Sequence, residues 1–462
     1  MTRGLIRLSS LLLVCVSTGA AAGEVPLLVD AARNADGAAL RALLEQGAIA
    51  SSAAVDGTTA LHWASYRDDV DGADLLIAAG ADVNAATDLS VTPLWLAAEN
   101  GSAAMVGKLL AAGANANSAL LSGETPVMVA SRSGDPDVVE QLLARGAAVN
   151  ARAARGQTAL MWAVAQQHAE VVAVLLAHRV DLHARSEVWS QMMAVPPHGR
   201  PEYNRAIPHG GNTALMFAAR VGDLASAKLL VAAGADVDDA DAWGVSATVL
   251  AAHAGYAELV DFLLAEGADP NNSAAGFAAL HVAIMHRDEQ TVAALLAHGA
   301  DANAPLRTWT PTRRASRDLY FSPALVGATP FWLAARFSQP AVMSLLAQHG
   351  ADPLFVHRAD HTPNYREHRR VEATTALMAA VGMGGRRLRA WVEPDGEPEA
   401  LTLEAARLAV ELGVDVNAAD VDGRTALDAA QALGYEMVVE FLVEQGARPG
   451  HLIAASHEGG RP

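Results

Sequence analysis

The sequence is poor in cysteine and in lysine. Cys15 is the one cysteine in 462 residues, which excludes a framework of internal disulfide bonds and any zinc site built on cysteines. Lys108 and Lys228 are the only lysines among 33 basic residues, so the other 31 are arginines. Acidic residues number 51, and the formal net charge of −18 argues against nucleic acid as a partner, because affinity for phosphates needs clustered cations.

Long apolar runs are also missing, since no stretch reaches the ~20 residues of a membrane-spanning helix. The N-terminus instead has Arg3 and Arg7, a short apolar centre at 11–16 and three alanines at 20–22. This order predicts a signal peptide over 1–22, cleaved near Ala22/Gly23. Cleavage would remove Cys15 and two arginines, changing the charge from −18 to −20. We expect a periplasmic or secreted protein with no stable membrane insertion.

The rest of the chain repeats with a period of 33 residues, and 52% of all residues are hydrophobic, which excludes a disordered chain. The string Gly-Ala-Asp-Val-Asn at 80–84 recurs in variants. A second motif, Thr-x-Leu-x-x-Ala, precedes most copies by 21 residues, as at Thr59 and Thr92. The glycines that begin the first motif are at 47, 80, 113, 146, 234, 267, 299, 350, 413 and 446.

Each copy predicts two short helices. The threonine is suited to cap the first helix, and a proline after it is tolerated there. Paired apolar residues one turn apart, such as Val138, Val139, Leu142 and Leu143, form the stripe of the second helix. The motif glycine suits a left-handed C-terminal cap. A further glycine, two residues before the next threonine, suits a chain reversal.

These motifs resemble the ankyrin repeat, whose signature is Thr-Pro-Leu-His-x-Ala, and exported bacterial proteins of that family in particular. The resemblance covers residues 26–453 in eleven copies. It implies an all-α solenoid over 24–453, with about eleven helix-turn-helix units joined by β-turn fingers. We expect residues 454–462 to form a flexible tail. Only His62 and His281 keep the signature histidine, so we expect more apolar packing than inter-repeat hydrogen bonding at this position.

Four loop insertions interrupt the period, at about 187–208, 305–323, 356–370 and 382–398. The first three should enlarge fingers that border the concave surface, whereas the fourth separates two helices of its own repeat and should project elsewhere. They hold thirteen of the 31 arginines, three of eight tryptophans and three of six tyrosines. These residue types are enriched at binding hot spots, and insertions in solenoids often lie on the binding face. Alternatively, they are tolerated loops whose aromatic side chains pack on the stack.

Two aromatic residues flank turn glycines in regular repeats, where side chains are normally exposed. Trp243 precedes Gly244 and Phe277 follows Gly276, so each either contacts a partner or packs on a neighbouring finger. Together with the insertions they give the predicted partner-binding residues: Trp189, Tyr203, Trp243, Phe277, Trp309, Arg313, Arg314, Arg317, Tyr320, Phe321, Tyr365 and Arg366.

The sequence offers no convincing catalytic, cofactor or metal site. His357, His361 and His368 lie close together, but Pro363 and four arginines in that segment oppose a metal. The glycine-rich segment 382–386 lacks the preceding strand and the lysine of a phosphate-binding loop. We therefore predict a monomeric, non-enzymatic scaffold for a protein or peptide with an acidic patch. The alternatives are an accessory subunit of an exported enzyme, or a hydrolase that uses the inserted loops.

Overall fold

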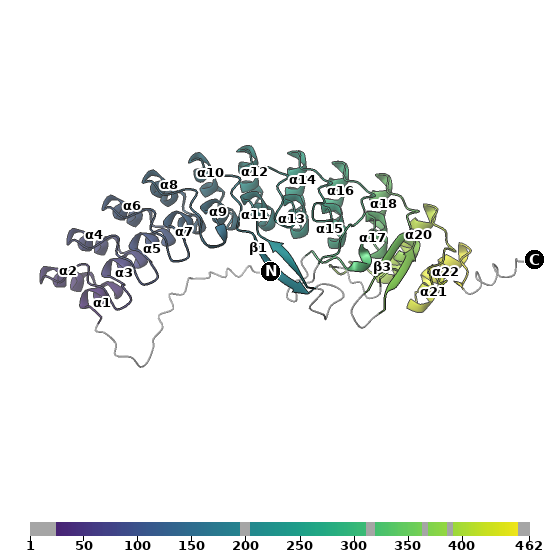
Figure 1. Ribbon diagram of the computed structural model, residues 1–462, viewed down its shortest axis with the longest axis horizontal. Helices are drawn as coiled ribbons and strands as arrows, with labels where there is room; N and C mark the ends of the chain where they lie inside the picture. Colours follow the sequence, from purple (N-terminus) through teal and green to yellow (C-terminus); the bar gives the residue numbers. More distant parts are fainter. Residues whose placement is uncertain (1–24, 195–203, 311–318, 363–367, 386–390, 451–462) are drawn as a thin grey trace, which may run out of the picture. The chain divides into compact units, whose positions relative to one another are not determined.

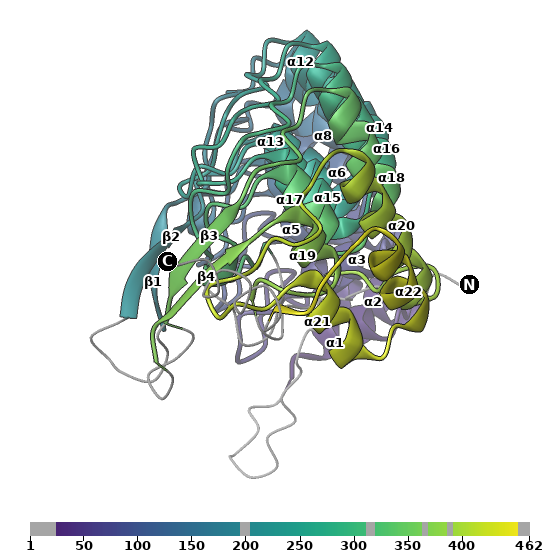
Figure 2. The same cartoon turned by 90° about the vertical axis from the view of Figure 1, so that its right-hand side faces the viewer.

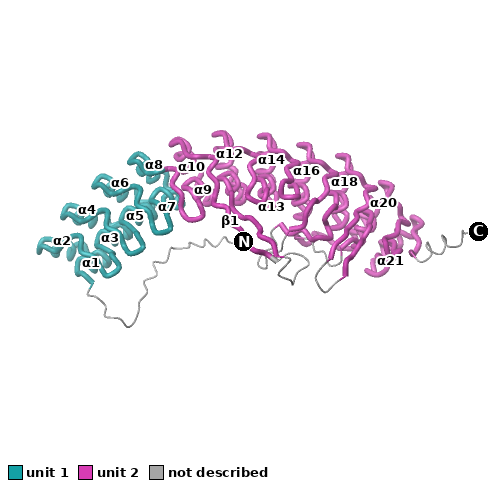
Figure 3. Tube along the Cα trace, in the orientation of Figure 1, with its two compact units in different colours: residues 1–148 teal, residues 149–462 magenta. Residues whose placement is uncertain are grey.

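The computed structural model describes residues 25–194, 204–310, 319–362, 368–385 and 391–450. The chain divides into two compact units, Met1–Ala148 and Val149–Pro462, each of which is a stack of helix pairs (Figures 1 and 3). The described residues contain eleven such pairs, which confirms the all-α repeat fold. The predicted signal peptide and the tail at 454–462 lie outside them.

Between residues 25 and 148 the first unit contains four helix pairs. Within the stack the first helix of each pair contacts the first helix of the next, and the second helices form a parallel row. The helices are α1 (Leu27–Arg33), α2 (Gly37–Glu45), α3 (Ala60–Arg67), α4 (Val70–Ala78), α5 (Pro93–Asn100), α6 (Ala103–Ala111), α7 (Pro126–Ser133) and α8 (Pro136–Ala144).

The described residues of the second unit contain seven helix pairs, two short 3₁₀ helices and two β-hairpins. Figure 2 shows the strands on the side away from the outer helices α14, α16 and α18. The elements are η1 (Ala154–Gly156), α9 (Ala159–Ala165), α10 (Ala169–Ala177), β1 (Trp189–Ala194), β2 (Asn204–His209), α11 (Ala214–Val221), α12 (Leu224–Ala232), α13 (Ala247–Ala254), α14 (Ala257–Ala265), α15 (Ala279–His286), α16 (Glu289–Ala297), η3 (Pro323–Leu325), α17 (Pro330–Arg336), α18 (Pro340–Gln348), β3 (His357–His361), β4 (Arg370–Thr374), α19 (Ala376–Ala380), α20 (Pro398–Glu411), α21 (Ala426–Leu433) and α22 (Glu436–Glu444).

The predicted helix ends are confirmed at most repeats. The Thr92 hydroxyl accepts the N–H of Trp95 at 3.2 Å, and Thr59 and Thr158 cap their helices in the same way. Thr125 and Thr213 occupy the same position without this hydrogen bond. All ten motif glycines have a positive φ, and Arg179 adopts the same left-handed conformation where the glycine is missing (φ 59°).

The signature histidine position holds histidine in two copies and methionine in four, while tryptophan, valine or aspartate fills the other four. His62 Nδ1 accepts the N–H of Thr59 at 3.1 Å, while its Nε2 donates to the carbonyl of Val91 in the next repeat at 3.0 Å. Met128, Met161, Met216 and Met378 take this position elsewhere and are buried. The expected apolar packing is therefore confirmed for these four repeats.

A row of asparagines supplies inter-repeat bonds that the sequence reasoning missed. In the first unit, Asn84 Nδ2 donates to the carbonyl of Gly113 at 3.1 Å and its Oδ1 accepts the N–H of Asn115 at 2.7 Å. Asn271 binds Gly299 and Asp301 in the same way in the second unit. Where the last residue of the Gly-Ala-Asp-Val-Asn motif is asparagine, as at Asn84 and Asn271, it ties one finger to the next.

Candidate partner-binding groove

The first insertion forms a β-hairpin, where we had expected a loop. Strands β1 and β2 are antiparallel, with Trp189 opposite His209 and Ala194 opposite Asn204. The base is fixed to the repeat because Ser186 N–H donates to the carbonyl of Asn212 at 3.0 Å. Gly210 is required here, since a Cβ at this position would lie 2.0 Å from the carbonyl oxygen of Glu187.

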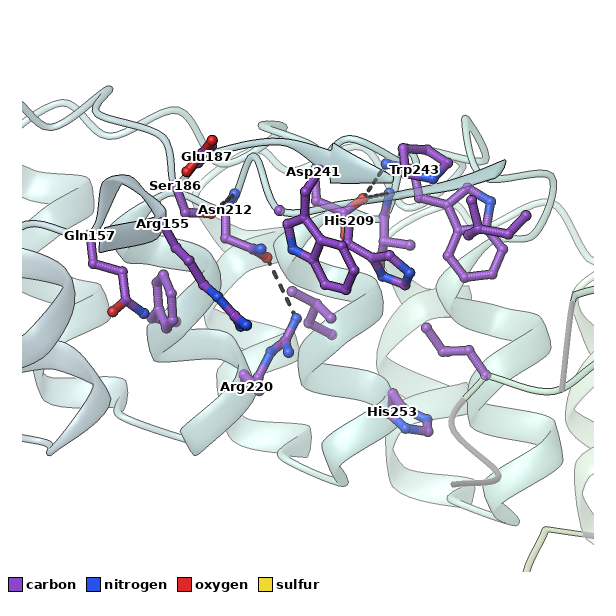
Figure 4. A pocket seen from close by; sticks show the side chains of 18 of the residues that line it. Arg155, Gln157, Ser186, Glu187, His209, Asn212, Arg220, Asp241, Trp243 and His253 are labelled. Atoms are coloured by element: carbon purple, nitrogen blue, oxygen red, sulfur yellow. Dashed lines mark hydrogen bonds between the residues drawn. The ribbon is translucent and has the colours of Figure 1, made fainter. Parts of the chain in front are cut away.

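An open groove of about 520 Å³ lies between this hairpin and helices α11 and α13 (Figure 4). One wall is the hairpin and the other is formed by the inner helices and the adjacent fingers of the second unit. The groove is lined by Arg155, Gln157, Ser186, Glu187, Trp189, Met193, Ile207, Pro208, His209, Gly210, Asn212, Phe217, Arg220, Asp241, Trp243, Val245, Leu250, His253, Ala254 and Leu319.

Three side chains in the lining of the groove, Arg155, Trp189 and His209, contact one another. The Trp189 ring packs on the His209 ring with centroids 4.5 Å apart and an interplanar angle of 25°. The guanidinium carbon of Arg155 lies 5.8 Å from the centroid of Trp189, within the range of a cation–π contact. Trp189 keeps 42% of its surface exposed, so its ring remains accessible to a partner.

The charged side chains of the groove are two arginines and two carboxylates. Arg220 Nη2 donates to Asn212 Oδ1 at 3.5 Å, a long and weak bond. Asp241 Oδ1 accepts the N–H groups of Trp243 and Val245 at 2.8 and 2.9 Å, which shape the following turn. The Asp241 carboxylate therefore has a structural task, while Arg155 and Arg220 are exposed residues. This arrangement suits a ligand with carboxylates and apolar surface.

The second and fourth insertions meet in an aromatic cluster next to the groove. The ring centroid of Trp391 lies 5.2 Å from that of Phe321, and its Nε1 donates to the carbonyl of Tyr320 at 2.8 Å. The expectation that the fourth insertion projects elsewhere is wrong at Trp391, which packs against the second insertion. Phe277 and Phe321 are buried (1% and 0% exposed), so we withdraw these two from the contact surface.

Two histidines form the floor of this cluster. His286 Nε2 and His253 Nδ1 are 2.9 Å apart, and the Trp391 ring lies edge-on to both. The pKa of His286 is lowered to about 4, mainly by burial and to a smaller extent by the nearby His253. The imidazole of His286 is therefore neutral at pH 7.

The third insertion is a second hairpin rather than a solvated loop. Strands β3 and β4 pair with His357 opposite Thr374. His357 is buried, its Nε2 donates to the carbonyl of Ala324 at 2.9 Å, and its ring centroid is 4.3 Å from that of Trp332. Burial lowers the pKa of His357. Within the described ranges no three histidine, cysteine or acidic residues come together to hold a metal.

The glycine-rich segment is occupied by its own protein contacts. The carbonyls of Gly384 and Gly385 accept from Arg336 Nε and Nη2 at 3.0 and 3.1 Å. The N–H of Gly385 donates to Glu372 Oε2 at 2.6 Å. Burial lowers the pKa of Arg336 to about 10, so the guanidinium stays charged at pH 7. The segment thus holds the half-buried Arg336 in place through its carbonyls, which do not bind phosphate.

Apart from the buried Phe277 and Phe321, the predicted residues separate into three groups. Trp189 and Trp243 line the groove, whereas Trp309 and Tyr320 are half-buried outside its lining. Sequence reasoning missed Arg155 and Arg220; the signal for Arg155 was its place in the finger before the first insertion. Six predicted residues lie outside the described residues: Tyr203, Arg313, Arg314, Arg317, Tyr365 and Arg366.

Comparison with known proteins agrees with the repeat pattern. A sequence model of the single ankyrin repeat matches residues 56–88, and a model of three ankyrin repeats matches 94–186 and 215–306. Among solved structures, the human ASB11 ankyrin repeat domain is similar, with 28% identity, a TM-score of 0.43, and coverage of 53% of this chain and 98% of that chain. No curated protein matches.

Ankyrin repeats are generally protein–protein interaction modules, and proteins built from them are typically non-enzymatic scaffolds. In the part of the chain that the structure describes, every helix is too short or too polar to cross a bilayer. The 33-residue motif, the stacked helix pairs and the sequence matches agree, and the chain therefore belongs to the ankyrin-repeat family.

Proposed function

We propose that this protein is a monomeric, non-enzymatic scaffold that acts in the periplasm or after secretion and holds a protein or peptide partner in the groove beneath the β1–β2 hairpin. The observation that carries the proposal is the exposed Trp189 ring, with Arg155 5.8 Å from its centroid, in the lining of a groove of about 520 Å³. The basic, apolar and alanine-rich N-terminal sequence supports export.

The partner should present carboxylates beside apolar side chains. Arg155 and Arg220 can each bind a carboxylate through two parallel hydrogen bonds, while Trp189 and Trp243 offer aromatic surface. The groove is built on stacked helices, so little conformational entropy is lost when a partner binds. Because the arginines are exposed, association should weaken as salt screens them.

Hydrolysis is the alternative function that the groove composition raises, since Ser186, His209 and Asp241 all line it. A nucleophile needs a base in reach and a group that orients the base. Ser186 Oγ instead accepts the N–H of Asn212 at 3.0 Å, the His209 ring is stacked on Trp189, and Asp241 shapes a turn. These tasks favour binding over catalysis.

Affinity capture with point variants tests the scaffold. The bait is residues 24–462, offered to an extract of exported proteins from the source organism. The test bait carries Arg155→Glu and Arg220→Glu, and the control bait carries Arg41→Glu, an exposed arginine on α2. Deleting 305–323 or 356–370 is a poorer test because it would remove the buried Phe321 or His357.

A protein retained by the wild-type and control baits and lost by the double variant would support the groove as the binding surface. We also expect retention to fall as the salt concentration of the wash rises. Equal retention by all three baits would refute the groove assignment. If a folded bait retains no protein, the scaffold itself is refuted.

A further inference from the structure

The β1–β2 sheet has an edge that no other strand covers. Among the described residues it contains two strands only, so one side of β1 and one side of β2 remain without a neighbour. Residues 189–192 of β1 are all exposed. An edge strand presents a row of N–H and C=O groups that can pair with another extended chain.

Strand β1 also lacks the residues that normally protect such edges. Its sequence, Trp-Ser-Gln-Met-Met-Ala, has no charge and no proline. Strand β2 carries Arg205 and Pro208, and both strands of the second hairpin are charged, with Arg358 and Asp360 on β3. Charged residues and prolines discourage strand pairing, so β1 is the one of the four described strands left open to it.

The two faces of β1 differ in chemistry. Trp189 and Met193 point to the groove, where Arg155 and Arg220 also lie. Residues 188 and 192 fall on the opposite face, because side chains alternate along extended chain. Val188 and Met192 are 57% and 65% exposed, and so form an apolar surface on that face.

We propose that the free edge of β1 binds an extended segment of the partner as a third β-strand of this sheet. The segment would alternate acidic and apolar residues, with the acidic side chains toward Arg155 and Arg220 and the apolar ones over Val188 and Met192. Backbone hydrogen bonds supply affinity in this mode and the alternating side chains supply specificity. The inference rests on the proposed function and specifies the class of partner for the same groove.

A synthetic peptide of eight residues that alternates glutamate and valine is a suitable probe. Its binding to the full chain is followed by fluorescence anisotropy of a terminal label. We expect saturable binding that is at least tenfold weaker for the matching lysine–valine peptide. Two further peptides carry N-methyl groups, one on the backbone nitrogens of its glutamates and the other on those of its valines. Only one of the two should bind tenfold more weakly, because alternate N–H groups of an added strand face the sheet.

Protein variants separate strand addition from other contacts. Met192→Glu places a carboxylate on an exposed edge position and should weaken binding at least fivefold with the hairpin still folded. The matched control is Val371→Glu, at a position 52% exposed on β4, which should bind like wild type. Hydrogen exchange should slow in residues 189–193 when the peptide is bound.

Three results would overturn the inference. The first is no binding of the glutamate–valine peptide at millimolar concentration, and the second is equal binding by both methylated peptides. The third is self-association of the chain that Met192→Glu abolishes, which would assign the edge to a second copy. If a captured partner depends on Arg155 and Arg220 but leaves the amides of 189–193 unprotected, the strand inference fails while the proposed function stands.

Discussion

An aspartate is one of the residues that interrupt the asparagine row of the second unit. Asn271 both donates to the carbonyl of Gly299 (3.0 Å) and accepts the N–H of Asp301 (2.7 Å). Asp238 holds the same motif position one repeat earlier and accepts the N–H of Asp269 at 2.8 Å. A carboxylate has no N–H to donate to the carbonyl of Gly267. We predict that Asp238→Asn makes the chain more stable.

The magnitude follows from three contributions. The new hydrogen bond should contribute ~0.5–1.5 kcal/mol net. The existing bond to Asp269 loses its charge assistance, which costs a fraction of that. Removing a negative charge beside Asp236 and Asp239 offsets this loss. The sum is about 1 kcal/mol, which corresponds to a rise in Tm of ~1–3 °C for a unit of this size.

Urea unfolding and calorimetry of the full chain at pH 7 would measure this change. The reciprocal variant, Asn271→Asp, should lose about 1 kcal/mol because its donor to Gly299 disappears. Glu266→Gln is the matched control: it removes one exposed charge next to Gly267 and should change stability by less than ~0.5 kcal/mol. The reasoning would be refuted if Asp238→Asn were no more stable than Glu266→Gln.

Three further outcomes are expected. Burial lowers the pKa of His281 to about 4. As the pH falls, this histidine is therefore protonated in the unfolded chain before it is protonated in the folded one. Up to about 3 kcal/mol of folding stability is lost between pH 6.5 and 4. His281→Met, the residue found at four equivalent positions, should flatten this loss in urea titrations at pH 7 and pH 5. Phe321→Ala should cost ~3–5 kcal/mol by leaving a cavity, as seen by thermal unfolding; a cost under 1 kcal/mol would contradict its burial. Trp391→Phe keeps the packing but loses the bond to Tyr320 and should cost about 1 kcal/mol, whereas Trp391→Ala should cost several times more.

The repeats could be predicted because their signals are local. Thr158 caps a helix that begins one residue later, and Val138 and Leu142 lie one turn apart on the same helix face. Such contacts recur every 33 residues, so a single chain contains many copies of the same evidence.

The insertions could not be predicted in the same way because their structure depends on distant contacts. The pairing of Trp189 with His209 leaves no periodic trace in the sequence. Arg155 and Arg220 line one groove only because the hairpin lies over helices α11 and α13. The aromatic content of the insertions could not show which side chains are exposed either. Phe321 is a core residue and Trp189 is an exposed one, although both are aromatic residues of an insertion.

The contact of Trp391 with Tyr320 also changes how the second unit should unfold. In a regular stack each repeat contacts only its neighbours, as Asn271 does with Gly299, 28 residues further on. Stability is then a sum of nearest-neighbour terms, and a stack can unfold from its ends. Trp391 bonds to a residue 71 positions away and packs on α13 and α15 as well. Helices α13 to α19 should therefore open together as one cooperative block, while the helix pairs outside it fray one by one.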